Sequence, residues 1–382
     1  MLFPYTDEEI QIRKMVRDFM ENEIAPNVDE WEEKCSIPRS IFKQMADLGL
    51  AGMSAPEELG GTDLDNQSKV IIAEEIGRIH RAIGYIFIHS MVVGIICEFG
   101  SEEQKERFVR PMVDGEKLAC FCLTEPGAGS DAGAITARAV KDGDNYILNG
   151  TKVFITNGDV ADIYFVAAKT KPEAGARGVS LFIVERGTKG LSVPKNEDKL
   201  GIKATNISEV VLDDCVVPAA NLLGNVENKG FAMLMDGLET GRMTNAGQAV
   251  GIAQGAYEIA LKYATEREAF GGTLADLQVI QFMLADMATE IEAARLLTYK
   301  AAWLKDQGLP AARYCSMAKR YAADTAMKVT TDCVQILGAY GYVKDYKVER
   351  YFRDAKGAQM VEGTSQIQRV IVWRDILKEF KK

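Results

Sequence analysis

A short segment near the carboxyl end holds the residues best suited to proton transfer. In residues 361–365, Val-Glu-Gly-Thr-Ser, the carboxylate of Glu362 directly precedes a glycine, where the backbone can turn sharply. Ser365 offers an oxygen that can cap a following helix, which the apolar spacing of residues 367–371 predicts. A carboxylate at such a loop-to-helix junction can accept a proton while free backbone N–H groups stabilise developing negative charge. The segment alone is equally compatible with a solvated loop glutamate.

A glycine-rich segment at residues 122–134, Cys-Leu-Thr-Glu-Pro-Gly-Ala-Gly-Ser-Asp-Ala-Gly-Ala, is the second candidate. Gly127 and Gly129 allow backbone N–H groups to approach an anion, and Ser130 adds a hydroxyl. The segment also contains Gly-x-Gly-x-x-Ala, which is similar to the dinucleotide fingerprint. That fingerprint needs a strand before it and a helix after it, and the residues that follow here are strand-like. A nicotinamide site is therefore disfavoured, and a tight structural turn remains the alternative to an anion site.

Composition narrows the class of protein. The chain has 382 residues with 47% hydrophobic and 26% charged residues, which is ordinary for a globular protein. Its net charge of −10 argues against nucleic acid as the main partner. The seven cysteines are scattered and form no Cys-x-x-Cys pair, and the chain has only two histidines. This pattern argues against a zinc site. We expect no signal peptide, no membrane span and a reducing cytoplasmic location.

The elements that must position these residues fall into three parts. Residues 1–118 are predicted to be a helical domain, opened by a capping box at residues 6–9. Residues 119–225 carry short β-branched runs between turn pairs, which predicts an antiparallel β-barrel or sandwich. Residues 226–382 are helical again and predict a four-helix bundle, giving an α+β fold overall. We expect strands at 135–140, 146–148, 152–156, 163–168, 179–184 and 210–212, and bundle helices at 246–264, 278–302, 311–337 and 365–380.

With these parts in order, the chain resembles the acyl-CoA dehydrogenases over essentially its whole length. Residues 122–134 match the first flavin-domain motif of that family at its constrained positions. Residues 335–345, continuing to Asp354, match the second motif, with Ala339 in place of the usual Gly or Ser. The resemblance implies bound FAD, α,β-desaturation of an acyl-CoA, transfer of electrons to an electron-transferring flavoprotein, and a homotetramer.

The resemblance also implies a set of cofactor contacts. Some should surround the flavin ring, with Thr364 on the opposite side, and Gly129 and Ser130 should lie near phosphates or the CoA chain. Arg267 and Phe270 should reach the FAD of a neighbouring subunit. The residues expected to bind FAD are Phe121, Leu123, Thr124, Gly129, Ser130, Phe154, Ile155, Thr156, Arg267, Phe270, Gln278, Gln335, Gly338, Thr364 and Gln366.

In the resemblance, Glu362 becomes the base that removes the α-proton of the thioester. Its own backbone N–H and a ribityl hydroxyl of FAD are the implied donors to the thioester oxygen. Some branches of the family carry the base just before an arginine in the first bundle helix; here that position is Gly241, before Arg242, and glycine cannot be a base. The expected substrate contacts are Ser130, Phe87, Leu238, Arg242, Val361 and Gly363.

Two departures from the family pattern bear on the acyl group. Val361 replaces a common tyrosine and Gly357 replaces a bulky aliphatic residue, so both remove volume near the acyl site. If substrate fills that volume, a short, branched, cyclic, aryl-substituted or dicarboxylic acyl group is favoured. Arg81 could pair with a distal carboxylate, although solvation is the simpler expectation, and His89 is expected to be packed or solvated. The reverse reaction, catalysed by an enoyl-CoA reductase, and a non-catalytic binding protein remain the alternatives.

Overall fold

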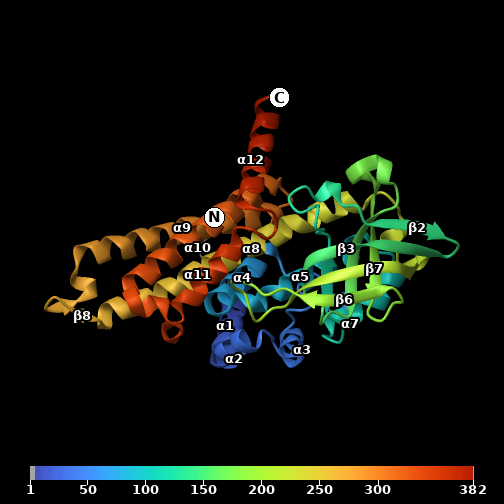
Figure 1. The fold of residues 1–382 in the computed structure, drawn as a ribbon. Helices are drawn as coiled ribbons and strands as arrows, with labels where there is room; N and C mark the ends of the chain where they lie inside the picture. The colour runs from blue at the N-terminus through green and yellow to red at the C-terminus, as the bar shows by residue number, and fades with distance from the viewer. Residues whose placement is uncertain (1–4, 382) are drawn as a thin grey trace.

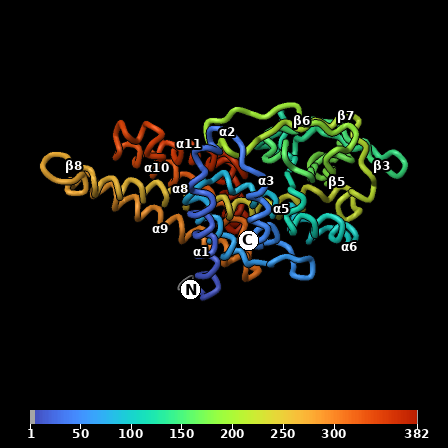
Figure 2. The backbone as a smooth tube through the Cα atoms, turned by 90° about the horizontal axis from the view of Figure 1, so that it is seen from below, coloured from blue at the N-terminus to red at the C-terminus, as the bar shows by residue number. Residues whose placement is uncertain are grey.

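The computed structural model describes residues 5–381, which form an N-terminal helical part, a β-sheet part and a C-terminal set of long helices (Figure 1). The β-sheet lies at one end of the molecule, and the tip of the α8–α9 hairpin lies at the other in both views (Figures 1 and 2). This order confirms the predicted succession of helices, strands and helices.

The N-terminal part is built mainly of apolar helices packed around a shared core. Thr6 caps the first helix and forms the predicted capping box with Glu9. A second capping box joins Ser101 and Gln104. The helices are α1 Asp7–Phe19, α2 Val28–Lys34, α3 Arg39–Asp47, α4 Asn66–Ile79, α5 Tyr85–Phe99, α6 Glu102–Gln104 and α7 Arg110–Val113.

Residues 81–99 are apolar and long enough to cross a membrane by length and composition. However, 72% of this window is buried inside the protein, and α5 contributes to a core shared with the sheet and α8. The segment therefore packs as a helix of the protein core.

The middle part is a seven-stranded sheet with the order β1-β4-β2-β3-β7-β6, in which β5 also pairs with β4. Most pairs are antiparallel as predicted, but β1 and β2 each lie parallel to β4, which corrects the expectation of a wholly antiparallel sheet. The strands are β1 Ala119–Cys122, β2 Arg138–Asp142, β3 Asn145–Thr156, β4 Ile163–Lys169, β5 Val179–Glu185, β6 Leu191–Asn196 and β7 Ile207–Pro218.

Strand β3 differs from its prediction in an informative way. We expected two strands separated by a turn at Asn149-Gly150, and the structure has one strand of 12 residues. The pairing with β7 shifts register between Leu148 and Gly150, and again between Lys152 and Ile155. These bulges absorb the glycine without ending the strand, and the second one redirects the side chains near its carboxyl end.

The C-terminal part contains α8 Gly230–Glu266, α9 Gln278–Asp306, α10 Ala312–Leu337, α11 Val348–Ala358 and α12 Ser365–Phe380, with the short hairpin β8 Glu268–Ala269 and β9 Gly272–Thr273 between α8 and α9. Helices α8, α9, α10 and α11 contribute to one core. Helix α12 projects away from that bundle (Figure 1) and buries only Ser365 and Gln368. The bundle therefore includes α11, which we did not predict, while most of α12 lies outside it and exposes Trp373 and Phe380.

Candidate active site

Glu362 lies in the turn between α11 and α12, as the sequence predicts. Its backbone has φ = 55° and that of Gly363 has φ = 86°, so two successive residues adopt the left-handed conformation. Thr364, rather than the expected Ser365, caps α12 by accepting a hydrogen bond from the backbone N–H of Ile367. Within the described residues, the backbone N–H groups of Glu362, Gly363 and Thr364 donate no hydrogen bond. The turn thus presents free donors beside a carboxylate.

Two side chains hold the carbonyl groups of this turn. Gln368 Nε2 donates to Glu362 O at 2.9 Å and to Gly363 O at 3.0 Å. Lys319, on α10 and fully buried, donates from Nζ to Gly363 O at 2.7 Å. A left-handed conformation is unfavourable for glutamate, so these bonds supply the constraint that maintains it. The sequence patterns gave no indication of either residue.

Three cations surround the Glu362 carboxylate. Burial raises the pKa of Glu362, and the charges of Arg242, Lys319 and Arg81 oppose that increase. Burial also lowers the pKa of Lys319 to about 7 and that of Arg81 to about 10. Glu362 forms no hydrogen bond through its carboxylate with any described residue. A carboxylate whose pKa is shifted by its surroundings, and whose oxygens form no hydrogen bond, is suited to proton transfer.

Helix α8 approaches the same carboxylate through Gly241. A Cβ atom added at Gly241 would lie 2.8 Å from Glu362 Oε2 and 3.0 Å from Cδ. Ordinary contacts are longer, so only glycine leaves this space for the carboxylate. The position that carries the base in some branches of the resembled family is therefore adjacent in space to Glu362, and one side chain at a time can occupy the site.

The glycine-rich segment after β1 is anchored by a buried ion pair. Lys152 Nζ, on β3, donates to Glu125 Oε1 at 2.8 Å and to Leu123 O at 3.0 Å. Glu125 also accepts the backbone N–H groups of Thr136 and Ala137. Sequence patterns missed this pair, because a lysine in an apolar strand gives no sign of a partner 27 residues away. The pair fixes both ends of the segment.

The residues predicted to contact a flavin ring come together at the ends of β1 and β3. Val153 N donates to Thr124 O at 2.9 Å, which joins the two segments directly. Phe154 has φ = 57° and is 65% exposed at the second bulge of β3, while Ile155 is buried. Phe121 is partly buried and stacks on Phe165. Thr156 follows at the end of the strand, next to Asn157, whose buried Nδ2 has no partner among the described residues.

The second group of predicted cofactor residues lies elsewhere in the chain. Arg267 and Phe270 lie at the tip of the α8–α9 hairpin, and Phe270 is 93% exposed. The guanidinium of Arg267 lies over the ring of Tyr340, close to Gly338 at the end of α10. Gln335 lies in the last turn of α10 and Gln278 begins α9. Within one chain the α8–α9 hairpin that carries Arg267 and Phe270 lies at the opposite end of the molecule from the sheet (Figures 1 and 2).

Two of the predicted substrate contacts are apolar and lie on facing helices: Phe87 is buried on α5, and Leu238 on α8 is partly buried. His89 is packed, as expected: its Nδ1 accepts the backbone N–H of Ala119, and burial lowers its pKa to about 3. The space beside Gly357 is already filled, because a Cβ there would lie 2.8 Å from Ile202 Cδ1. The volume argument from Gly357 is therefore wrong.

Two further predictions about side chains can be placed. We expected Arg81 to be solvated, and this expectation is wrong: the residue is buried, with an exposed fraction of 6%. Val361 is 39% exposed beside the base. Three other predicted contacts lie in the segments that carry their motifs. Gly129 and Ser130 lie in the segment after β1, and Gln366 is exposed in the first turn of α12.

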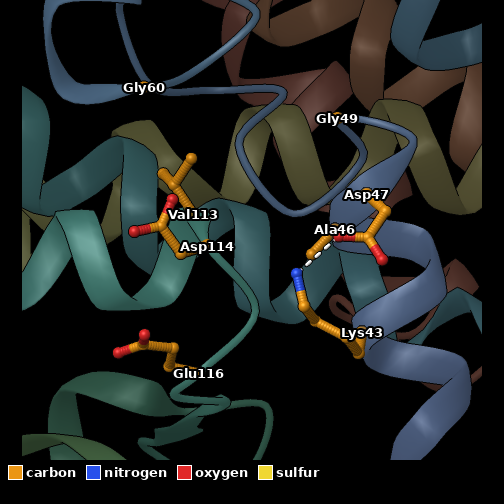
Figure 3. Close-up of a pocket in the computed structure, with 8 residues that line it drawn as sticks. All are labelled: Lys43, Ala46, Asp47, Gly49, Gly60, Val113, Asp114 and Glu116. Carbon is orange, nitrogen blue, oxygen red and sulfur yellow. Dashed lines mark hydrogen bonds and ion pairs between the residues drawn. The ribbon is translucent and has the colours of Figure 1, made fainter.

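The hollow shown in Figure 3 is not part of this region. It lies between α3 and the end of α7 and is lined by Lys43, Ala46, Asp47, Gly49, Gly60, Val113, Asp114 and Glu116. Lys43 pairs with Asp47 across one turn of α3. None of the predicted site residues lines it.

Comparison with known proteins agrees with the geometry. Three family models match, described as the N-terminal domain (residues 6–116), the middle domain (120–215) and the C-terminal domain (228–377) of acyl-CoA dehydrogenase. The chain belongs to the acyl-CoA dehydrogenase family. A Bacillus subtilis protein named acyl-CoA dehydrogenase is 47% identical over 97% of this chain and 98% of its own length.

Two other matches extend the comparison. The chain is 43% identical to the caffeyl-CoA reductase–Etf complex subunit CarC of Acetobacterium woodii, over 98% of this chain and 100% of that protein. The solved structure of butyryl-CoA dehydrogenase from Megasphaera elsdenii superposes with a TM-score of 0.95 at 42% identity, covering 98% and 99% of the two chains. The protein is therefore an FAD-dependent oxidoreductase acting on CH–CH bonds.

The residues of this acyl-CoA dehydrogenase fit its cofactor. A Cβ added at Gly127, Gly129 or Gly338 would meet no atom within 4 Å, so these peptides face open space. Backbone N–H groups in such open, glycine-rich turns can approach phosphate oxygens closely. The exposed ring of Phe154 and the unpaired Nδ2 of Asn157 offer an apolar surface and a donor at the end of the sheet.

Proposed function

We propose that this acyl-CoA dehydrogenase desaturates an acyl-CoA at its α,β bond with Glu362 as the base. The supporting observation is the uncommitted carboxylate of Glu362, held in a turn with free backbone N–H groups and surrounded by three cations. FAD, when bound, supplies the acceptor for the β-hydride. Glu362 takes the α-proton, and its own N–H stabilises the negative charge that develops on the thioester oxygen.

The electrostatics suit a base that works near neutral pH. An unprotonated carboxylate is required to accept the proton, and Arg242, Lys319 and Arg81 favour that ionised form. Burial opposes them and strengthens the basicity of the carboxylate. Bound substrate would exclude water and increase both effects, because charges interact more strongly in an environment of low dielectric constant.

The cofactor site that we propose is shared between subunits. Phe121, Leu123, Thr124 and residues 154–156 would hold the flavin ring from the sheet side, with Thr364 opposite. Ser130 and Gly129 would lie along the phosphates or the CoA chain. Residues at the hairpin tip and at the end of α10 would hold the adenosine end from a second subunit. The separation of these groups within one chain supports a homo-oligomer, and a homotetramer is our proposal.

Electron-transferring flavoprotein is the partner we propose for reoxidation. The supporting comparison is the relative from Acetobacterium woodii, whose name places it in a complex with Etf. The free cysteines of the chain are compatible with a reducing compartment, and a cytoplasmic location is part of the proposal. For the acyl group we retain a short, branched, cyclic, aryl-substituted or dicarboxylic chain, which now rests on Val361 and not on Gly357.

The reverse reaction is the second candidate, and the comparison gives it specific support. The relative named as a subunit of a caffeyl-CoA reductase–Etf complex is 43% identical to this chain, against 47% for the Bacillus subtilis protein named acyl-CoA dehydrogenase. By microscopic reversibility, a protonated Glu362 would return the α-proton to an enoyl-CoA. The same side chains serve both directions, and the redox potentials of substrate and partner decide between them.

The experiment is an anaerobic titration of the purified holoenzyme, followed by its visible absorption. Butyryl-, isobutyryl-, cyclohexanecarboxyl-, glutaryl- and aryl-substituted acyl-CoAs should be compared for bleaching of the flavin band. Glu362→Gln should retain FAD but reduce it at least ~10²–10⁴-fold more slowly. Glu103→Gln, at an exposed position on α6, is the matched control. Flavin reduction by Glu362→Gln at the rate of the control would refute the assignment.

A further inference from the structure

The turn that carries Glu362 has two carbonyl oxygens bonded from the same side. Gln368 Nε2 donates to Glu362 O at 2.9 Å and to Gly363 O at 3.0 Å, so a single nitrogen atom draws the two oxygens together. Lys319 Nζ also donates to Gly363 O, at 2.7 Å. A trans peptide group is planar, so its N–H points opposite to its C=O. The N–H groups of Gly363 and Thr364 therefore point together, away from Lys319 and Gln368.

The two side chains behind the turn are fully buried. Lys319, on α10, and Gln368, near the start of α12, both have an exposed fraction of 0%. Lys319 Nζ donates to no other group among residues 5–381, and the buried Oε1 of Gln368 has no partner there. Burying an ammonium group and an amide is costly, and here the bonds that offset this cost go to the backbone of one short turn. The orientation of that turn is therefore fixed before any ligand binds.

The N–H groups on the opposite side of the turn are free. Those of Gly363 and Thr364 donate no hydrogen bond to any described residue. Successive backbone N–H groups that point in one direction form a site for negative charge. The proposed reaction generates such a charge beside Glu362, when the α-proton leaves the thioester.

We propose that Lys319 and Gln368 are positioning residues, which aim the N–H groups of Gly363 and Thr364 so that the turn presents positive potential to the anion formed from the thioester. The proposal rests on the proposed function, in which Glu362 removes the α-proton. In this proposal neither side chain touches the substrate, and both act through the turn. Donors that are oriented in advance stabilise a developing anion without reorganising during the reaction.

The two residues differ in one useful respect, which is charge. An ammonium group at the oxygen of a peptide polarises that peptide and makes its N–H a better donor. Lys319 can therefore strengthen the Thr364 N–H as well as orient it. Gln368 is neutral, so it orients the turn without adding a charge. Comparing the two residues separates orientation from charge.

The test measures stabilisation of an anion with a probe in place of turnover. Acetoacetyl-CoA carries an acidic proton between two carbonyl groups, and its enolate absorbs at longer wavelength than its keto form. The holoenzyme with bound probe is titrated with pH in the Glu362→Gln background, so that the charge of the base does not enter. Lys319→Met and Gln368→Met are each added to this parent. The control is Thr330→Val, in α10, whose buried hydroxyl donates only within its own helix.

Each methionine variant should lower the ionisation constant of the bound probe by ~10- to 10²-fold, because misplaced donors stabilise an anion poorly. The double variant should lose less than the product of the two single effects, because both side chains act on one turn. Thr330→Val should leave the constant unchanged. The other charged groups that act on Lys319 are Arg81, Arg242 and Asp324, and all three are retained in every variant. FAD content and Tm report on folding.

Each outcome bears on one proposal. An unchanged ionisation constant in either methionine variant overturns the positioning role, whatever happens to Tm. A parent that binds the probe without raising its ionisation constant above that of the free probe overturns it as well. Wild-type holoenzyme whose flavin is bleached by no acyl-CoA overturns the proposed function instead. If Lys319→Met does not fold, Gln368→Met alone decides.

Discussion

Replacing Gly241 by alanine tests the position of the base without changing the base itself. The added Cβ would lie 2.8 Å from Glu362 Oε2, 3.0 Å from Cδ and 3.2 Å from Oε1. Ordinary contact begins near 3.4 Å, so the carboxylate must move by several tenths of an ångström. A displacement of about 1 Å at a reacting group can cost ~10²-fold in rate, so we expect a loss of roughly tenfold to 10²-fold here.

The matched control is Gly247→Ala, in the same helix. A Cβ there would lie 2.9 Å from Ala73 Cβ and 3.0 Å from Val70 O, so the crowding is similar but involves α4 and not Glu362. Both substitutions gain about 0.5–1 kcal/mol of helix propensity and lose about 1–3 kcal/mol to overpacking. Their Tm values should therefore change similarly, whereas only Gly241→Ala should slow flavin reduction.

The assay is stopped-flow bleaching of the flavin band at saturating acyl-CoA under anaerobic conditions, with FAD content and Tm measured on the same preparations. Saturation separates the chemical step from binding. Equal reduction rates in Gly241→Ala and Gly247→Ala would show that the Glu362 carboxylate does not lie against Gly241 in the reacting complex. The geometric argument for the base would then be wrong.

Three further predictions follow from the same structure. Arg267→Ala should weaken FAD retention by roughly 1.5–3 kcal/mol and loosen the oligomer, measured by FAD content and sedimentation; an intact oligomer of unchanged stability after FAD loss would count against the shared site. Burial lowers the pKa of Lys319 from 10.5 to about 7, so between these values the unfolded chain binds more protons and the free energy of unfolding rises with pH. In Lys319→Met, the free energy of unfolding measured with urea should rise less steeply with pH across that range. An unchanged dependence on pH would show that Lys319 is not its source. Val361→Tyr should reduce kcat/KM for aryl-substituted or cyclic acyl-CoAs far more than for butyryl-CoA, and an equal loss for all would show that neighbours already fill the space.

Local signals predicted the elements that local interactions determine. The capping box of α1 uses side chains three residues apart, and strands β4 and β5 are short apolar runs, so neighbouring residues suffice. Strand β6 was missed because its exposed residues and Pro194 resemble a loop. The first turns of α8 were missed because Gly230, Gly237 and Gly241 weaken the helical pattern.

The candidate site divides in the same way. Glu362 at a helix junction was predictable from its glycine neighbour and the following apolar spacing. The burial of Arg81, the ion pair of Glu125 with Lys152 and the bond from Lys319 to Gly363 join residues far apart in the chain. Charged residues are exposed by default, so only the packed structure reveals those that are not. The filling of the space beside Gly357 by Ile202 is equally non-local.

The left-handed backbone of Glu362 has a consequence for selection experiments on this enzyme. A glutamate at φ = 55° stores of order 1–3 kcal/mol that glycine or asparagine would release. Random mutagenesis scored only for thermal tolerance should therefore enrich substitutions at this codon, and on the proposed role of Glu362 as the base these variants should have lost their activity. A library of this enzyme must be screened for turnover and heat resistance together, because at this residue the two traits are in direct conflict.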